Sequence, residues 1–281
     1  MLATYRGLRF AVLGLCAGIC LGSEPVLLEL RQPRDRQLSG GESHEYRFVL
    51  NAGQYARLLV DQRSVNVAVE ICDPSGKSVY AADSYPAGDA EVLQFVAENS
   101  GIHRLRLFAP ARTAPLGLYS ITLDEIVPAT DRHRHLAAGA LAYAKAMASA
   151  TEGSKASRAS ASKSFDEAIT HWQAAQDFVA EARTLTTLGL HYGQTGERRK
   201  AIEFTGRALK VAKASENSQA EAWAWMTSRC KSAHSGGSTG AVISMGSPAA
   251  SARVGCVAIY AAAAAVPARK ERRLVRMAPQ F

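Results

Sequence analysis

Two different periods of hydrophobic and polar positions divide this chain. From Pro25 to Ile126, short runs rich in Val, Leu, Ile, Tyr and Phe alternate with polar residues and are separated by Gly, Pro and Asp. Six runs have the length and composition of strands: 47–50, 56–60, 65–71, 92–96, 102–108 and 118–123. Several short strands at this spacing are typical of antiparallel sandwiches. Residues 25–126 are therefore predicted to form an all-β sandwich, jelly-roll or Ig-like, that folds on its own.

Beyond residue 130 the period becomes that of amphipathic helices, and the pattern repeats. A spaced trio of residues occurs twice, forty positions apart: Ala161, Phe165 and Ala168, then Ala201, Thr205 and Ala208. The pair Glu181-Ala182 recurs at the same interval as Glu221-Ala222. A period of about forty residues made of two short helices is typical of helical repeat arrays. We expect residues 130–226 to be an all-α array of helical hairpins.

The best-defined hairpin has two apolar stripes. The first helix carries Leu185, Leu188, Gly189 and Tyr192 on one face, with the glycine where another helix must approach closely. Gly196 is expected to end this helix, and Glu197 to begin the next. The stripe of the second helix is assigned to Ala201, Ile202, Thr205, Ala208 and Leu209.

These residues resemble the tetratricopeptide repeat (TPR), whose helix pair carries a bulky residue, Leu-Gly, Tyr, then Ala, an aromatic residue and Ala. The resemblance implies packing roles for Leu185, Leu188, Gly189, Tyr192, Ala201 and Ala208, and in the preceding unit for Ala161, Phe165 and Ala168. Thr205 departs from the pattern, although Phe204 beside it partly fills the gap. The first helix of the preceding unit, about 136–150, lacks the signature, and residues 152–164 are either a loop or a weak helix start. An ordinary helical hairpin is the alternative.

The sandwich segment resembles the bacterial pre-peptidase C-terminal-like domain. The motifs that carry this resemblance are Ser39-Gly40-Gly41 before Tyr46, Ala52-Gly53-Gln54, Asp73-Pro74-x-Gly76, Asn99-Ser100-Gly101 and Gly117-x-Tyr119-x-Ile121. Some relatives bind calcium or carbohydrate. Here Asp61, Asp83 and Asp89 are too scattered to form a site, so each is expected in a solvated turn. A different Ig-like family is the alternative.

Residues 1–23 have the composition of a secretory signal peptide. Arg6 and Arg9 precede an uncharged apolar run, which is too short to span a bilayer comfortably. The segment predicts export to the periplasm or the medium. An uncleaved anchor and a lipoprotein processed at Cys16 or Cys20 are alternatives.

The basic charge of the chain is concentrated at its C-terminus. Residues 227–281 contain eight Lys or Arg and one acid, whereas residues 24–226 contain 23 Lys or Arg and 24 acids. A nucleic-acid function is disfavoured because it requires a basic face on folded structure. The segment has no sustained helix or strand period, so it is predicted to be disordered. A short apolar anchor at 254–266 and an out-of-frame reading are the alternatives.

Candidate reactive side chains are few. His133 and His135 are two positions apart, which places them on different helix faces, so they are expected at a solvated helix start that Thr130 or Asp131 caps. Cys72 is expected to be a small buried hydrophobe. Nothing orients His234 toward Cys230, so we assign no thiol dyad. No catalytic, cofactor or metal site is predicted.

Two functional classes follow from these features. The first, which we favour, is a non-enzymatic exported scaffold whose TPR-like helices bind a protein or peptide partner, with no nucleic acid and no membrane beyond a signal anchor. The second is the N-terminal part of a caspase-like CHAT peptidase, since a known bacterial architecture joins such a sandwich and repeats to that domain. No residue here matches its catalytic His or Cys.

Overall fold

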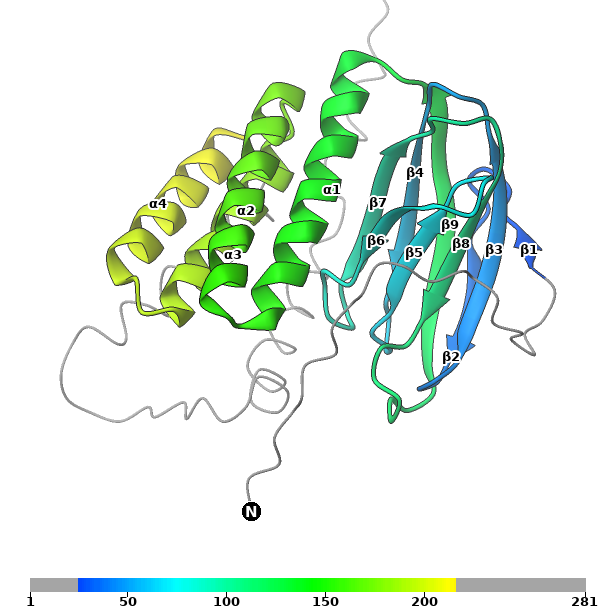
Figure 1. Ribbon diagram of the computed structural model, residues 1–281, viewed down its shortest axis with the longest axis horizontal. Helices are drawn as coiled ribbons and strands as arrows, with labels where there is room; N and C mark the ends of the chain where they lie inside the picture. The colour runs from blue at the N-terminus through cyan, green and yellow to red at the C-terminus, as the bar shows by residue number, and fades with distance from the viewer. Residues whose placement is uncertain (1–24, 216–281) are drawn as a thin grey trace, which may run out of the picture. The chain divides into compact units, whose positions relative to one another are not determined.

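The computed structural model describes residues 25–215 (Figure 1). Within this range, a β-sandwich-like domain of two sheets is followed by a region of four helices, which agrees with the β and α segments expected from the sequence. The expected signal peptide at 1–23, the recurring pair at 221–222 and the tail at 227–281 lie outside the described residues.

The strands form one sheet of five and one sheet of four. The five-stranded sheet has the order β1 (Val26–Leu27), β3 (Ser43–Leu50), β8 (Gly101–Phe108), β5 (Ala68–Cys72) and β6 (Ser78–Ala82). The four-stranded sheet has the order β2 (Arg34–Leu38), β9 (Gly117–Pro128), β4 (Gln54–Asp61) and β7 (Ala90–Val96). Only β1 and β3 pair in parallel among these strands. The hairpins and long crossovers therefore build a sandwich and not a parallel sheet.

Alternation along the strands makes the core. In β3, Tyr46, Phe48 and Leu50 are buried while Arg47 and Val49 are exposed, because successive side chains point to opposite faces. The two sheets meet through rings such as Phe48 and Phe95, 6.0 Å apart in an edge-to-face arrangement. The alternating pattern in the sequence thus marks the inner face of each sheet.

Five of the six expected strand runs lie within strands, and the sixth is wrong in its first half. Val65 and Val67 are buried but lie in a loop before β5. The backbone N–H of Val67 donates to Gln62 Oε1 at 2.6 Å, so it is satisfied without a strand partner. Strands β1, β2 and β6 were not predicted from the sequence.

The helices are α1 (Asp131–Glu152), α2 (Lys155–Ala175), α3 (Phe178–Gln194) and α4 (Arg198–Ala214). Thr130 caps α1 as expected, accepting a hydrogen bond from the backbone N–H of His133 at 3.3 Å. Residues 152–164 are mostly helix, because Ser154 caps α2 immediately after the left-handed Gly153. Gly196, with φ of 86°, lies in the turn between α3 and α4, as expected.

The helices and the sheets contact each other through α1. This helix lies along β7 and also touches β6, the strands that end the two sheets (Figure 1). At its start, the His133 ring stacks on Tyr55 of β4 with centroids 4.5 Å apart. His133 and His135 lie at the start of α1, as expected, but they are half-buried and not fully solvated, since His135 also contacts His171 of α2.

Candidate functional site

The residues assigned to helix packing are all buried. They lie on the inward faces of α2, α3 and α4, with exposed fractions of 0–8%. The set comprises Ala161, Phe165 and Ala168 on α2, Leu185, Leu188, Gly189 and Tyr192 on α3, and Ala201 and Ala208 on α4. The two trios separated by forty residues therefore occupy equivalent positions on the second helix of each hairpin.

Gly189 lies where α3 and α4 approach each other closely. A Cβ at this position would lie 3.2 Å from Thr205 Oγ1 and 3.3 Å from the carbonyl oxygen of Ala201. Both distances are tighter than ordinary van der Waals contact, so a larger side chain would push the helices apart. The glycine, and the small residues facing it, set the spacing of this hairpin.

Thr205 lies at the position where the sequence resemblance implies an aromatic residue. Its side chain is buried, and its hydroxyl donates to the carbonyl oxygen of Ala201 one turn earlier. Phe204 supplies the missing ring, stacking on Tyr192 of α3 with centroids 5.4 Å apart. The aromatic contact between the two helices is kept by a neighbouring position.

The first hairpin has a close contact of a different kind. A Cβ at Gly139 of α1 would lie 2.9 Å from ring carbons of Trp172 on α2. The indole N–H of Trp172 donates to Thr184 Oγ1 of α3 at 3.1 Å, so this ring joins three helices. The sequence analysis missed this pair, because Gly139 lies outside the repeated pattern and its partner is 33 positions away.

A loop of the sandwich contacts both first helices of the hairpins. Tyr85, between β6 and β7, stacks on Tyr143 of α1 with centroids 5.7 Å apart, and the guanidinium of Arg183 on α3 lies 3.8 Å from its ring centroid. Arg183 also pairs with Asp89 at 3.6 Å. Asp89 was expected in a solvated turn and is instead a partner of the helices. We call Tyr85, Asp89, Tyr143 and Arg183 the junction.

Glu91 of β7 hydrogen-bonds the backbone of the loop that carries Tyr85. Its Oε1 accepts hydrogen bonds from the backbone N–H groups of Ser84 at 2.5 Å and Tyr85 at 2.7 Å. The carboxylate is 2% exposed, and burial raises its pKa to about 7, against the lowering effect of the two amides. Glu91 is thus a buried carboxyl group whose pKa lies near neutrality.

The other acidic residues singled out in the sandwich sequence have different surroundings. Asp73 begins the 73–76 turn, where its Oδ1 accepts from the backbone N–H groups of Ser75 at 2.9 Å and Lys77 at 3.0 Å. Gly76 has a φ of 92°. Asp83 lies in an exposed loop, as expected, and accepts from Asn66. The turn expected at Asp61 is wrong, because this residue ends β4, where its backbone is opposite Ala90 and Ser120 and its side chain pairs with Arg63. Cys72 is buried, as expected.

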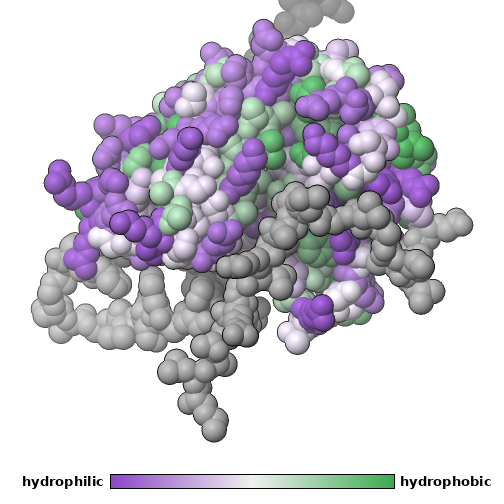
Figure 2. Space-filling model, viewed as in Figure 1, coloured by the Kyte–Doolittle hydropathy of each residue, from purple (hydrophilic) through white to green (hydrophobic). Residues whose placement is uncertain are grey.

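The helical surface presents isolated apolar side chains. Ile202 is 66% exposed, so its assignment to the inward stripe of α4 is wrong. Phe204 takes its place beside Ala201, Thr205 and Ala208, which are buried as expected, and Ile202 lies on the other face. Figure 2 shows a mostly hydrophilic surface over the helices, with small apolar groups between the charged ones.

Residues 25–215 show neither a metal-binding cluster nor a bilayer-spanning helix. Residues 25–215 contain no group of three or more His, Cys, Asp or Glu arranged to hold a metal ion. Within the same range, none of the helices combines the length and the apolarity needed to cross a bilayer.

Comparison with known proteins gives limited likenesses. No family model matches the chain, and no curated protein matches it. Among solved structures, the pre-peptidase C-terminal domain of a Bacillus anthracis collagenase matches with a TM-score of 0.29 and 12% identity, covering 35% of this chain and 93% of that one. PliG of Aeromonas hydrophila, a periplasmic inhibitor of g-type lysozyme, matches with a TM-score of 0.29 and 16% identity, covering 34% and 91%.

A second PliG, from Salmonella Typhimurium, matches with a TM-score of 0.28 and 19% identity over 35% of this chain. Likenesses this weak assign no activity. The class that the structure defines is a β-sandwich-like domain followed by a helical region. One of its neighbours carries the domain name that the sequence motifs suggested, at about a third of the chain.

The contacts of the junction are expected to stabilise the folded protein. Arg183→Ala removes both the cation–π contact with Tyr85 and the ion pair with Asp89, so the free energy of unfolding should fall by about 1–2 kcal/mol. Arg63→Ala, which removes two exposed ion pairs, with Asp35 and Asp61, should cost less than about 1 kcal/mol. Urea denaturation measures both, and a double-mutant cycle with Asp89→Asn isolates the pair. Equal losses for Arg183→Ala and Arg63→Ala would contradict a junction that fixes the helices.

Proposed function

We propose that this chain is an exported scaffold that binds a partner protein or peptide through TPR-like helices. The observation that carries the proposal is the outer face of α4. Ile202 is exposed there, and one turn later the Cβ position of Gly206 has no atom within 4 Å in the described chain. Leu209, at i+7, is half-buried and packs partly against the core, so it borders this surface. Such a surface is suited to an apolar helix or peptide.

The arrangement of the first helices supports this choice of surface. Arg183 on α3 and Tyr143 on α1 are already engaged by Tyr85. The face that α1 and α3 share is therefore partly occupied by the sandwich, and a partner would meet α4 more easily. A scaffold held by buried contacts also loses less conformational entropy on binding.

Site-specific cross-linking tests the proposal. A photoreactive residue is placed in the full-length chain either at Ile202 or at Val49, which is 57% exposed on the sandwich and serves as a matched control. In the native periplasmic or extracellular fraction, we expect a discrete adduct from position 202 and none from position 49. Ile202→Glu should abolish capture of that partner, and Val49→Glu should leave it unchanged. Capture that is equal at both positions, or insensitive to Ile202→Glu, would reject the α4 surface.

The second class, the N-terminal part of a CHAT peptidase, has a separate test. Reading all frames of the DNA downstream for a caspase-like domain decides it. None of the contacts in residues 25–215 favours it over a binding scaffold.

A further inference from the structure

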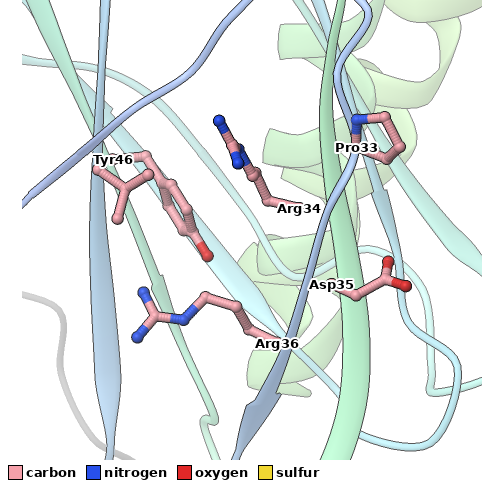
Figure 3. Close-up of a pocket in the computed structure, with 6 residues that line it drawn as sticks. Pro33, Arg34, Asp35, Arg36 and Tyr46 are labelled. Atoms are coloured by element: carbon pink, nitrogen blue, oxygen red, sulfur yellow. The ribbon is translucent and has the colours of Figure 1, made fainter.

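A groove lies beside β1 and β2, at one edge of the sandwich. Its volume is about 430 Å³, and it is lined by Val26, Pro33, Arg34, Asp35, Arg36 and Tyr46 (Figure 3). The strands β1 and β2 end their respective sheets. The helices contact the opposite strands, β6 and β7. This groove is therefore separate from the junction and from the α4 surface.

Two arginines enter the groove from one strand. Arg34 and Arg36 are two positions apart on β2, so their side chains project to the same face, about 6.6 Å apart along the strand. In Figure 3 both extend toward Tyr46. Asp35 between them points to the other side of β2. The alternation of one strand thus sorts two positive charges into the groove and one negative charge out of it.

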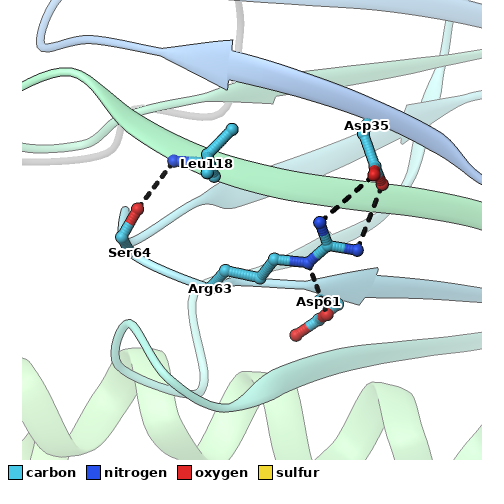
Figure 4. A network of polar contacts seen from close by, with 5 residues as sticks. All are labelled: Asp35, Asp61, Arg63, Ser64 and Leu118. Carbon is cyan, nitrogen blue, oxygen red and sulfur yellow. Dashed lines mark hydrogen bonds and ion pairs between the residues drawn. The ribbon is translucent and has the colours of Figure 1, made fainter.

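The outward carboxylate has its own partner. Asp35 receives a bidentate pair from Arg63, with distances of 3.1 and 3.2 Å, and Arg63 also donates to Asp61 at 3.1 Å (Figure 4). Through Arg63, these bonds connect β2 to the end of β4. They also hold the Asp35 carboxylate on the side of β2 that faces away from the groove. The Arg63 bonds thereby help to fix the orientation of β2, the strand that carries the two arginines.

The arginines themselves are poorly neutralised. Arg34 has one acidic neighbour, Glu29, at the long distance of 3.9 Å, and its Nε is buried without a hydrogen-bond partner in the described chain. A buried donor without a partner is costly, which points to an acceptor that completes the site. Burial lowers the pKa of His44, and the positive charge of Arg36 lowers it further, while Glu42 opposes both effects.

The ring of Tyr46, which is fully buried, forms the inner wall. Tyr46 and Tyr119 share a hydrogen bond of 2.6 Å between their oxygens, and His44 Nδ1 lies 2.6 Å from Tyr119 Oη. These contacts hold the Tyr46 ring in the wall of the groove, on the side facing β2. The groove therefore presents two guanidinium forks from one strand opposite a fixed phenol.

We infer that this groove binds a tetrahedral oxyanion, phosphate or sulfate, held between Arg34 and Arg36 and facing Tyr46. One guanidinium fork satisfies a carboxylate with two parallel hydrogen bonds. Two forks together offer donors for more than two oxygens, and guanidinium geometry suits phosphate and sulfate groups. The ligand is either the free ion or the same group esterified on a larger molecule.

Titration of the full-length chain at constant ionic strength tests the site. Calorimetry with inorganic phosphate, and separately with sulfate, should show saturable binding. Arg34→Gln and Arg36→Gln should each weaken it by about tenfold or more, as expected for loss of a charge-assisted hydrogen bond. Arg47→Gln removes an exposed positive charge on the outer face of β3 and should change affinity less than twofold. The side-chain Nε–Hε resonance of Arg34 should shift during the titration.

The outcomes separate the possibilities. Equal weakening by Arg47→Gln, no saturation, or an unmoved Arg34 resonance would overturn the site. Methyl phosphate distinguishes the two sources of the anion. Binding at least as tight as inorganic phosphate indicates an esterified ligand, and much weaker binding indicates the free ion. Circular dichroism of each glutamine variant confirms that the sandwich remains folded.

Discussion

Replacing Gly189 with leucine should destabilise the second helical hairpin by about 2 kcal/mol. The glycine lies against Ala201 and Thr205, where even a Cβ would be 3.2–3.3 Å from atoms of α4. A leucine gains about 1 kcal/mol in helix propensity but forces overpacking that costs about 3 kcal/mol, so the steric effect wins. Thermal melts followed by circular dichroism measure the loss. Hydrogen exchange should show the change in α3 and α4, while the core strands of the sandwich keep their protection.

Gly206→Ala is the matched control for this prediction. It lies on the same hairpin, but its added Cβ meets no atom within 4 Å of the described chain. This change should stabilise the protein by about 0.5–1 kcal/mol through helix propensity alone. If Gly189→Leu left the melt unchanged, Gly189 would not be a packing position and the hairpin would not depend on close approach.

The largest pH effect is expected from Glu91. Its pKa is about 7 in the folded chain, against an ordinary value of 4.5, because burial outweighs the hydrogen bonds from Tyr85 and Ser84. Nearby Asp83 raises the pKa further, and Arg183 lowers it. A raised folded-state pKa stabilises the protein below pH 4.5, and that stability is lost as the pH rises through about 7. The shift corresponds to about 3 kcal/mol.

Glu91→Gln measures this effect directly. Glutamine keeps an oxygen that accepts from the two backbone amides but does not ionise. Other carboxyl groups, such as Asp35 and Asp73, have lowered pKa values and give the opposite slope, so the useful quantity is the difference between the two proteins. The free energy of unfolding, from urea titrations between pH 4.5 and 8, should fall more steeply with pH in the parent chain. Parallel curves would mean that Glu91 ionises as freely in the fold as in the unfolded chain.

Strands could be predicted from the sequence where the alternation of buried and exposed positions was regular. Alternation along β3 and β8 exposed one face and buried the other, so their strands were readable from residue types. Edge strand β2 was not readable, because its sequence is Arg-Asp-Arg-Gln-Leu and much of it is exposed. Its place is set by pairing with β9, which lies some eighty positions away in the chain.

The candidate sites show a similar division. Buried small residues on α3 and α4 follow from helical spacing within one hairpin. The error at Ile202 arose because two neighbouring apolar positions lie 100° apart on a helix, and only one can face inward. The junction had no local signal at all. Tyr85 and Asp89 lie in a loop rich in Pro and Gly, and their partner Arg183 comes from α3.

The position of α1 along β7 also bears on how separate molecules meet. A strand at the end of a sheet can pair with the same strand of another copy and thereby start aggregation. The sequence of β7, Ala-Glu-Val-Leu-Gln-Phe-Val, is apolar enough to invite such pairing. A fragment ending at residue 126 would keep both sheets but lose the helix beside this strand. The helical region thus hinders pairing of β7 with another copy. A chain that keeps these helices should aggregate less at high concentration than the fragment does.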